Sequence, residues 1–318
     1  MKQPVDGAMH EERREKQVIR GLWLETLTSF AEAYPDDAHP LYVTLSGAEA
    51  IDIQLLVTNG LVAVEENGAI ALRHRHRVVA VENRASAVVA LATRFPGLKI
   101  IEQPFQNLLR SESPVRWPDG EHADLCCARV INLDLNEPLG DVDRNGQLTF
   151  PVVEWIAKLG QIHAQKRLDW TLCLTLHGEI TWGTETSKSV AEFLLENFAL
   201  EPAFRDQCHT WLGAALFERI DTADPSFATL STEEQQRILM VFVPKKIAQV
   251  IHDQGWSVSV SRNLRYGGRR QQAPMVSWIM NFQWDPRASR RPQALYREAL
   301  REILTGAGKV EEDGRISA

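Results

Sequence analysis

The stretch from Leu41 to Asn83 constrains the fold of this chain more than any other part of the sequence. It begins with the apolar run Leu41-Tyr-Val-Thr-Leu45, turns through small residues at Ser46-Gly-Ala-Glu-Ala50, and continues with helical spacing. A second apolar run, Arg77-Val-Val-Ala-Val-Glu82, ends on an acid. This is the order of a nucleotide-binding βαβ unit, in which small residues let the backbone approach a ligand and the acid accepts from ribose hydroxyls.

Strand-like and helical segments alternate along the rest of the chain. A helix is predicted over residues 11–34 and a small hairpin over 61–72. Further strands are predicted over 98–102, 123–135 and 169–176, and helices over 85–95, 150–166, 186–198, 202–217 and 231–254, the last interrupted near Pro244. Alternating strands and helices predict an α/β protein with a doubly wound, mostly parallel sheet and helices on both faces.

Two segments near the end of the chain have a different period. Residues 256–261 and 275–284 alternate between apolar and polar side chains, which predicts a C-terminal antiparallel hairpin joined by a basic loop. A last helix over 293–304 and a charged tail follow.

This order of elements resembles the class I S-adenosylmethionine-dependent methyltransferases, which end in such an antiparallel pair. The resemblance covers about residues 41–285 and rests on element order more than on motifs. It implies three parts: an N-terminal helical extension (1–40), a methyltransferase-like Rossmann domain (41–285), and a C-terminal helix and tail (286–318).

The resemblance also implies a cofactor, S-adenosylmethionine, and the places where it binds. In this family the first βα turn holds the methionine end, the acid after the second strand holds the ribose, and the loop after the fourth strand faces the substrate. The cofactor-binding residues are then Ser46, Gly47, Glu49 and Glu82, and the catalytic candidates are Asn132 and Asp134. Each has a structural alternative: the turn of residues 46–50 suits a simple helix start without a ligand, Glu82 suits the start of the next helix, and Asn132 and Asp134 suit the end of a strand.

The first turn departs from the glycine-rich loop of nucleotide-binding folds. Gly47 is its one glycine, and it is the residue expected to supply a left-handed backbone position, since Ala48 and Ala50 suit such a position poorly. Glu49 and Asp52 place negative charge near the helix start. That charge suits the ammonium group of S-adenosylmethionine better than a pyrophosphate.

The methyl acceptor is not identified by the sequence. Residues 132–138 lack the Pro-Pro-aromatic motif of amino-methylating enzymes. The degenerate turn and this missing motif also suit a catalytically inactive methyltransferase-fold subunit that binds a protein partner.

Nucleic acid is a further candidate partner. The formal charge of −7 argues against broad nucleic-acid binding. A local concentration of arginines still predicts phosphate contact, or else a solvated sheet edge, and it comprises Arg262, Arg265, Arg269 and Arg270. The tract Arg73-His-Arg-His-Arg77 is interpreted as a solvated face and not as a metal site.

Composition and short motifs exclude several classes. The apolar runs are too short to cross a bilayer and the first residues lack a signal core, so we expect no membrane partner and a cytoplasmic location. The four cysteines show no C-x-x-C spacing and are expected to be reduced thiols, and no metal motif is present.

Overall fold

The computed structural model describes residues 14–35, 40–110, 115–116, 122–123, 128–135, 139–142, 148–178, 184–221, 227–267, 273–287, 303–304 and 306–317. They form an α/β protein built on one mixed sheet of nine strands. The sheet strands are β1 (Tyr42–Thr44), β2 (Val78–Glu82), β3 (Lys99–Glu102), β6 (Val130–Asp134), β9 (Trp170–His177), β10 (Trp256–Tyr266), β11 (Met275–Trp284), β12 (Ala307–Val310) and β13 (Ile316–Ser317). The predicted α/β class is confirmed.

The strand order is β13-β12-β10-β11-β9-β6-β1-β2-β3. Strands β3, β2, β1, β6 and β9 are parallel to one another, whereas β11 is antiparallel to both β9 and β10. The predicted hairpin is therefore present. It is not the edge of the sheet, because β12 pairs with β10 and β13 pairs with β12.

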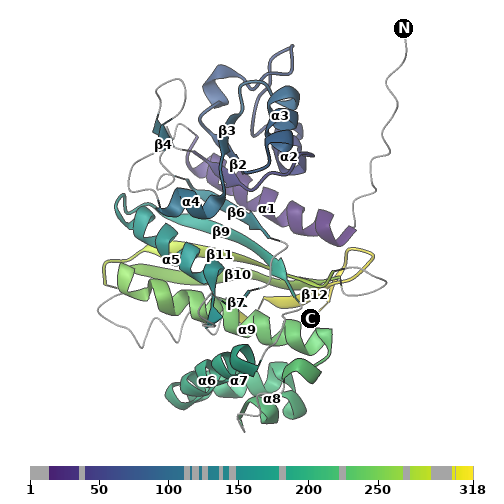
Figure 1. The fold of residues 1–318 in the computed structure, drawn as a ribbon, viewed down its shortest axis with the longest axis vertical. Coiled ribbons are helices and arrows are strands. Elements are labelled where there is room, and N and C mark those ends of the chain that lie inside the picture. The colour runs from purple at the N-terminus through teal and green to yellow at the C-terminus, as the bar shows by residue number, and fades with distance from the viewer. Residues whose placement is uncertain are drawn as a thin grey trace.

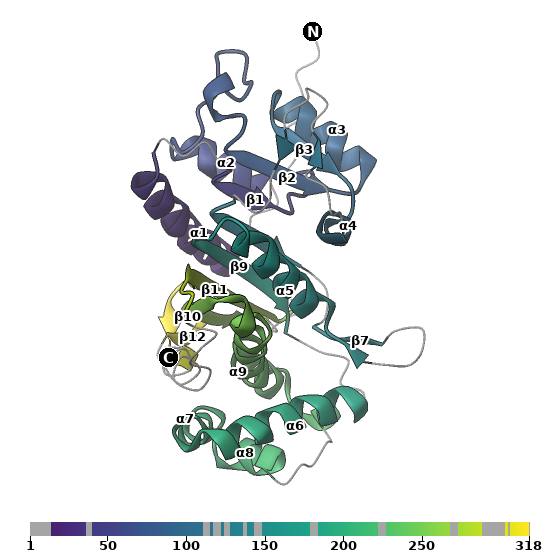
Figure 2. The ribbon, with the colours of Figure 1, turned by 90° about the vertical axis from the view of Figure 1, so that its left-hand side faces the viewer.

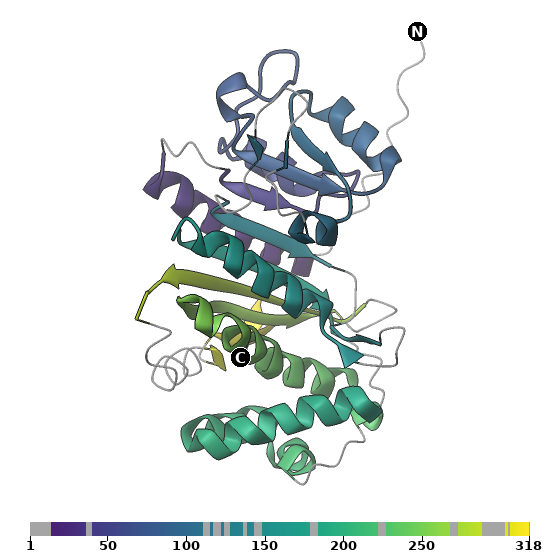
Figure 3. The same cartoon turned by 60° about the vertical axis from the view of Figure 1, so that its left-hand side comes forward.

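Helices cover both faces of this sheet, as predicted. They are α1 (Arg14–Ala33), α2 (Ile51–Thr58), α3 (Ala85–Arg94), α4 (Phe105–Arg110), α5 (Pro151–Ala164), α6 (Thr184–Leu200), α7 (Pro202–Leu212), α8 (Ala214–Asp221) and α9 (Thr232–Ile251). Figure 3 shows α5 and α9 in front of the sheet and α1 behind it.

Two apolar cores follow from the alternation of side chains along the strands. Val43, Val79 and Val81 point toward the face covered by α4, α5 and α9. Their neighbours Tyr42, Val78 and Ala80 point toward α1, α2 and α3. Successive strand residues face opposite sides of a sheet, and a sheet buried on both faces therefore has near-continuous apolar strands.

Helices α6 to α8 form a separate layer. They pack on one another and on α9 through apolar side chains such as Phe198, Phe204 and Phe217, and they lie beyond α9 from the sheet (Figures 1 and 2). None of the helices among the described residues is long and apolar enough to cross a membrane.

Several predicted elements differ in detail. Helix α9 begins with the capping box of Ser231 and Glu234 and runs through Pro244 without interruption. The helix predicted over 202–217 is two helices, because Gly213 ends α7 with a φ of 81°. The hairpin predicted over 61–72 is reduced to one bridge between Val64 and Ile70.

The C-terminal segment contributes strands that the sequence did not indicate. Residues 307–310 and 316–317 form β12 and β13 within the main sheet, where a charged tail was expected. Most of the predicted helix over 293–304 lies outside the described residues, and the predicted division into three parts stays a prediction.

Candidate functional site

The carboxyl ends of four parallel strands open into one cleft of about 530 Å³. Residues that follow β1, β2, β3 and β6 line it, Lys16 and Arg20 reach it from α1, and Trp155 reaches it from α5. Strand β1 lies between β2 and β6, so the chain turns to opposite sides of β1 at this point. Doubly wound sheets bind ligands at such a switch point.

The predicted cofactor residues meet in this cleft. Ser46, Gly47, Glu49 and Glu82 all line it, as does Asp134. Asn132 is not a lining residue. Its side chain is fully buried within the sheet.

The left-handed residue of the first turn is an alanine and not the glycine of the turn. Ala50 adopts the left-handed conformation, with φ 49° and ψ 36°, and its N–H donates to the Gly47 carbonyl at 3.0 Å. Gly47 has no positive φ, so the expectation that it supplies the left-handed position is wrong. A left-handed alanine costs on the order of 1 kcal/mol, and such a residue persists only where its surroundings hold it, as burial holds Ala50 here.

Two features of this turn leave polar groups open toward a ligand. The Ser46 hydroxyl is buried and has no hydrogen-bond partner among the described residues. Helix α2 starts after Ala50 without a side-chain cap. Its first amide groups are therefore the unpaired donors of a helix N-terminus.

Glu82 ends β2 with its carboxylate fixed in place. Oε1 accepts from the backbone N–H groups of Asn83 and Arg84, both at 2.9 Å, and from Arg84 Nε at 3.2 Å. Burial raises the pKa of this carboxyl, but the hydrogen bonds and charge of Arg84, with the Asn83 amide, outweigh it and hold the pKa below its usual value. Oε2 accepts from Arg84 Nη2 at 3.2 Å, and an ionised oxygen can accept a second donor.

Asn132 belongs to a buried network centred on Asp52. Asp52 Oδ2 accepts from Thr44 Oγ1 at 3.0 Å, from Asn132 Nδ2 at 3.0 Å and from the Tyr42 hydroxyl at 3.3 Å. Asp52 Oδ1 accepts from Arg20 Nε at 3.1 Å. The network therefore ties α1, β1, α2 and β6 together directly beneath the cleft.

Asp134 faces the cleft at the end of β6. Its Oδ2 lies 3.0 Å from Lys16 Nζ, and the exposed fractions of the two side chains are 14% and 30%. A carboxylate at this place can accept a proton or a hydrogen bond from a bound molecule, provided that the lysine gives way.

An aromatic pair completes the wall of the cleft. Phe105 follows β3 and Trp155 lies on α5, and their rings meet edge to face with centroids 6.1 Å apart. The sequence patterns indicated neither residue as part of the site. Phe105 could have been found because it follows a strand whose carboxyl end lies at the same edge of the sheet, whereas no sequence signal places Trp155, Lys16 or Arg20 there.

The charges of the cleft nearly cancel. Each of three carboxylates is paired with a base: Asp134 with Lys16, Asp52 with Arg20, and Glu82 with Arg84. Glu49 is exposed and forms no ion pair with any described residue. One uncompensated carboxylate therefore remains, and it favours a cationic ligand.

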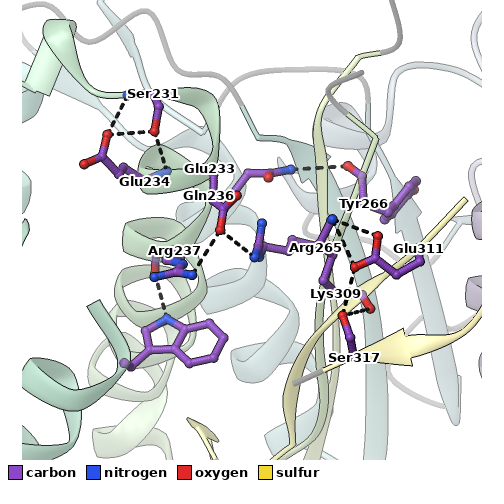
Figure 4. Close-up of polar contacts among 11 residues, drawn as sticks. Ser231, Glu233, Glu234, Gln236, Arg237, Arg265, Tyr266, Lys309, Glu311 and Ser317 are labelled. Carbon is purple, nitrogen blue, oxygen red and sulfur yellow. Dashed lines mark hydrogen bonds and ion pairs between the residues drawn. The ribbon is translucent and has the colours of Figure 1, made fainter. Parts of the chain in front are cut away.

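One arginine of the basic segment predicted to contact nucleic acid is paired with a carboxylate. Arg262 and Arg265 lie in β10 and not in a loop. Arg265 is buried, and its Nη2 donates to Glu233 Oε1 at 2.9 Å (Figure 4). Arg265 is in register with Lys309 of β12, which pairs with Glu311. Only Arg262 of this group is exposed in the described part of the chain, since Arg269 and Arg270 lie outside it.

Comparison of this chain with protein-family models, curated proteins and solved structures finds no match. The described residues contain no cluster of three or more histidine, cysteine or acidic side chains that could hold a metal ion. The cleft itself is thus the basis for a functional assignment.

Proposed function

We propose that the cleft binds S-adenosylmethionine and that the protein transfers its methyl group to an acceptor. The observation that carries this proposal is the meeting of Glu82 and the turn Ser46–Ala50 in one cleft at the switch point of the sheet. Glu82 is the acid at the end of the second parallel strand, where the methyltransferase resemblance requires an acceptor for ribose hydroxyls.

The order of the strands also supports a methyltransferase. The order β3-β2-β1-β6-β9 is that of a doubly wound sheet. Antiparallel β11 lies between β9 and β10 and supplies the final pair on which the methyltransferase resemblance rests.

The charge of the cleft fits this cofactor better than a dinucleotide. S-adenosylmethionine has a sulfonium, an ammonium and a carboxylate, and therefore one net positive charge. Glu49 is the carboxylate without an ion pair in the described cleft and would face the ammonium, whereas a pyrophosphate beside it would be repelled. The cleft volume of about 530 Å³ lies within the range of ligand pockets, roughly 300–1,000 Å³.

Each of these residues of the cleft would have its own role in binding or catalysis. Glu82 would hold the ribose, and Ser46 and the first amides of α2 would bind the methionine end. The cofactor supplies a methyl group on an electron-poor sulfur. Asp134 would orient the acceptor and take up its proton, and much of the rate enhancement would come from positioning.

A second candidate function is ligand binding without catalysis, as in an assembly subunit. It is favoured by the state of the two predicted catalytic residues: Asn132 is buried in the Asp52 network and Asp134 is paired with Lys16. Both functions require a ligand in the cleft, and they differ in whether a methyl group is transferred.

Calorimetric titration tests the proposal. We expect wild-type protein to bind S-adenosylmethionine and S-adenosylhomocysteine with micromolar affinity, and Glu82→Gln to weaken both at least tenfold, about 1.4 kcal/mol. Glu102→Gln is the matched control, because Glu102 is the register partner of Glu82 on β3, is exposed and does not line the cleft. Folded wild-type protein that binds neither compound would refute the proposal.

Transfer of a labelled methyl group to cell-extract fractions then separates the two functions. Transfer by wild-type protein that is lost in Asp134→Asn supports the enzyme, and cofactor binding without transfer supports the binding subunit.

A further inference from the structure

A second polar feature lies at the amino end of β2, whereas the cleft lies at the carboxyl ends of the strands. Residues Arg73, His74, Arg75, His76 and Arg77, here called the basic turn, follow one another directly before β2. The tract is not a strand: it begins within the 3₁₀ helix Leu72–His74 and turns into Val78. It therefore lies at the amino end of the strand whose carboxyl end carries Glu82.

No arginine of the basic turn is paired with a carboxylate among the described residues. Arg84, Arg237 and Arg265 each pair with a carboxylate. Arg73, Arg75 and Arg77 form no ion pair with any carboxylate in the described part of the protein. Three positive charges are thus concentrated within five residues of a chain whose formal net charge is −7.

The conformation of the turn is held by neighbouring backbone. His74 Nδ1 accepts from the Ala63 N–H at 2.7 Å, and Arg75 Nε donates to the Ile70 carbonyl at 3.3 Å. Arg75 also lies against Gly97, where an added Cβ would be 2.8 Å from Nε. These contacts order the turn before any partner arrives, which lowers the entropy cost of binding.

The electrostatic environment of His74 is consistent with a positive surface. Burial and the charges of Arg73, Arg77 and His76 lower the pKa of His74. A neutral ring accepting at Nδ1 fits that direction. In addition, Arg77 Nε is buried and lacks a hydrogen-bond partner among the described residues.

Arginine-rich, ordered turns suit phosphate. The planar guanidinium forms paired hydrogen bonds with phosphate oxygens and is more weakly hydrated than an ammonium group. The 3₁₀ helix has three residues, too few to place a helix in a duplex groove and read base edges. A lipid surface is less well matched, because Leu72 is the one strongly exposed large apolar side chain in this segment and one such side chain anchors weakly.

We propose that the basic turn binds the phosphate backbone of a single-stranded nucleic acid, without sequence preference. This inference is independent of the cofactor assignment. The segment at 262–270 stays a separate prediction, since Arg269 and Arg270 lie outside the described residues.

Fluorescence anisotropy with labelled 20-nucleotide oligothymidylate and oligouridylate tests the proposal over 25–200 mM NaCl. Three phosphate contacts predict a slope of about −2 in the logarithm of the association constant against that of salt concentration. The variant Arg73→Ala/Arg75→Ala/Arg77→Ala should bind at least tenfold more weakly at low salt and lose most of that slope. Arg262→Ala/Arg287→Ala, which removes two exposed arginines elsewhere, should bind like wild type.

Arg73→Glu keeps the test valid if the triple variant misfolds, because the Arg73 side chain is exposed and forms no hydrogen bond with described residues. This single change should weaken binding about three- to fivefold. Unchanged affinity in folded Arg73→Glu, or a loss confined to Arg262→Ala/Arg287→Ala, would overturn the proposal. So would cosedimentation with phosphatidylserine vesicles in the absence of oligonucleotide binding.

Discussion

Replacing Asp52 with asparagine tests how the cleft is held in shape. The carboxylate of Asp52 faces donors from four residues: Arg20, Tyr42, Thr44 and Asn132. An asparagine has one acceptor oxygen and turns an NH₂ group toward at least one of these donors. It also removes the negative charge that pairs with Arg20, whose side chain is 9% exposed.

Loss of one partner of a buried ion pair costs roughly 3–5 kcal/mol, because the other charge is left without compensation. Arg20 keeps other contacts, so we expect Asp52→Asn to lower the free energy of unfolding by about 3 kcal/mol. Urea denaturation followed by tryptophan fluorescence measures this difference. Asp253→Asn is the control, since Asp253 is exposed and forms no hydrogen bond with the described residues, and it should change the free energy by less than about 0.5 kcal/mol.

The same substitution should also weaken ligand binding under conditions where the variant is folded. Asp52 lies two residues after left-handed Ala50, so a shift of the network moves the turn that faces the ligand. Equal stabilities of Asp52→Asn and wild type would refute the argument that this network holds the cleft.

Other substitutions test the rest of the fold. Burial lowers the pKa of Lys245 to about 8 from 10.5, against the opposing effect of Glu201. The folded state therefore binds fewer protons than the unfolded state above pH 8, and the free energy of unfolding should rise by up to about 3 kcal/mol toward pH 10.5. Urea titrations at several pH values measure this rise, and the variant Lys245→Met/Glu201→Leu should abolish it. Burial raises the pKa of the Cys173 and Cys208 thiols, so peptide mapping should find neither labelled by a thiol reagent until urea unfolds the protein. Ser231→Ala removes the capping box of α9 and should cost about 1 kcal/mol in thermal or urea unfolding.

Features set by local pattern were predictable from the sequence. Alternating strands and helices indicated the α/β class, and the period-two segments indicated the β10–β11 pair. Glu82 could be placed at a strand end because the apolar run before it ends there. Ser46 and Glu49 followed from their position after the first strand.

Features set by contacts between distant segments were not predictable. Arg265 belongs to a period-two strand, yet burial and pairing with Glu233 remove it from the surface. The left-handed residue of the turn is Ala50 and not Gly47, since packing around Ala50 overrides the intrinsic preference of glycine.

The sequence by itself determined most of the strands and helices up to residue 284, and the order in which they follow one another, because side-chain periodicity acts over a few residues. Only the tertiary structure decided that Lys16 and Arg20 of the first helix meet Asp134 and Asp52 at the cleft. Only the tertiary structure decided, too, that residues 307–317 extend the sheet. Such long-range contacts depend on how whole helices and strands pack. A local sequence pattern does not specify which distant residue a side chain contacts.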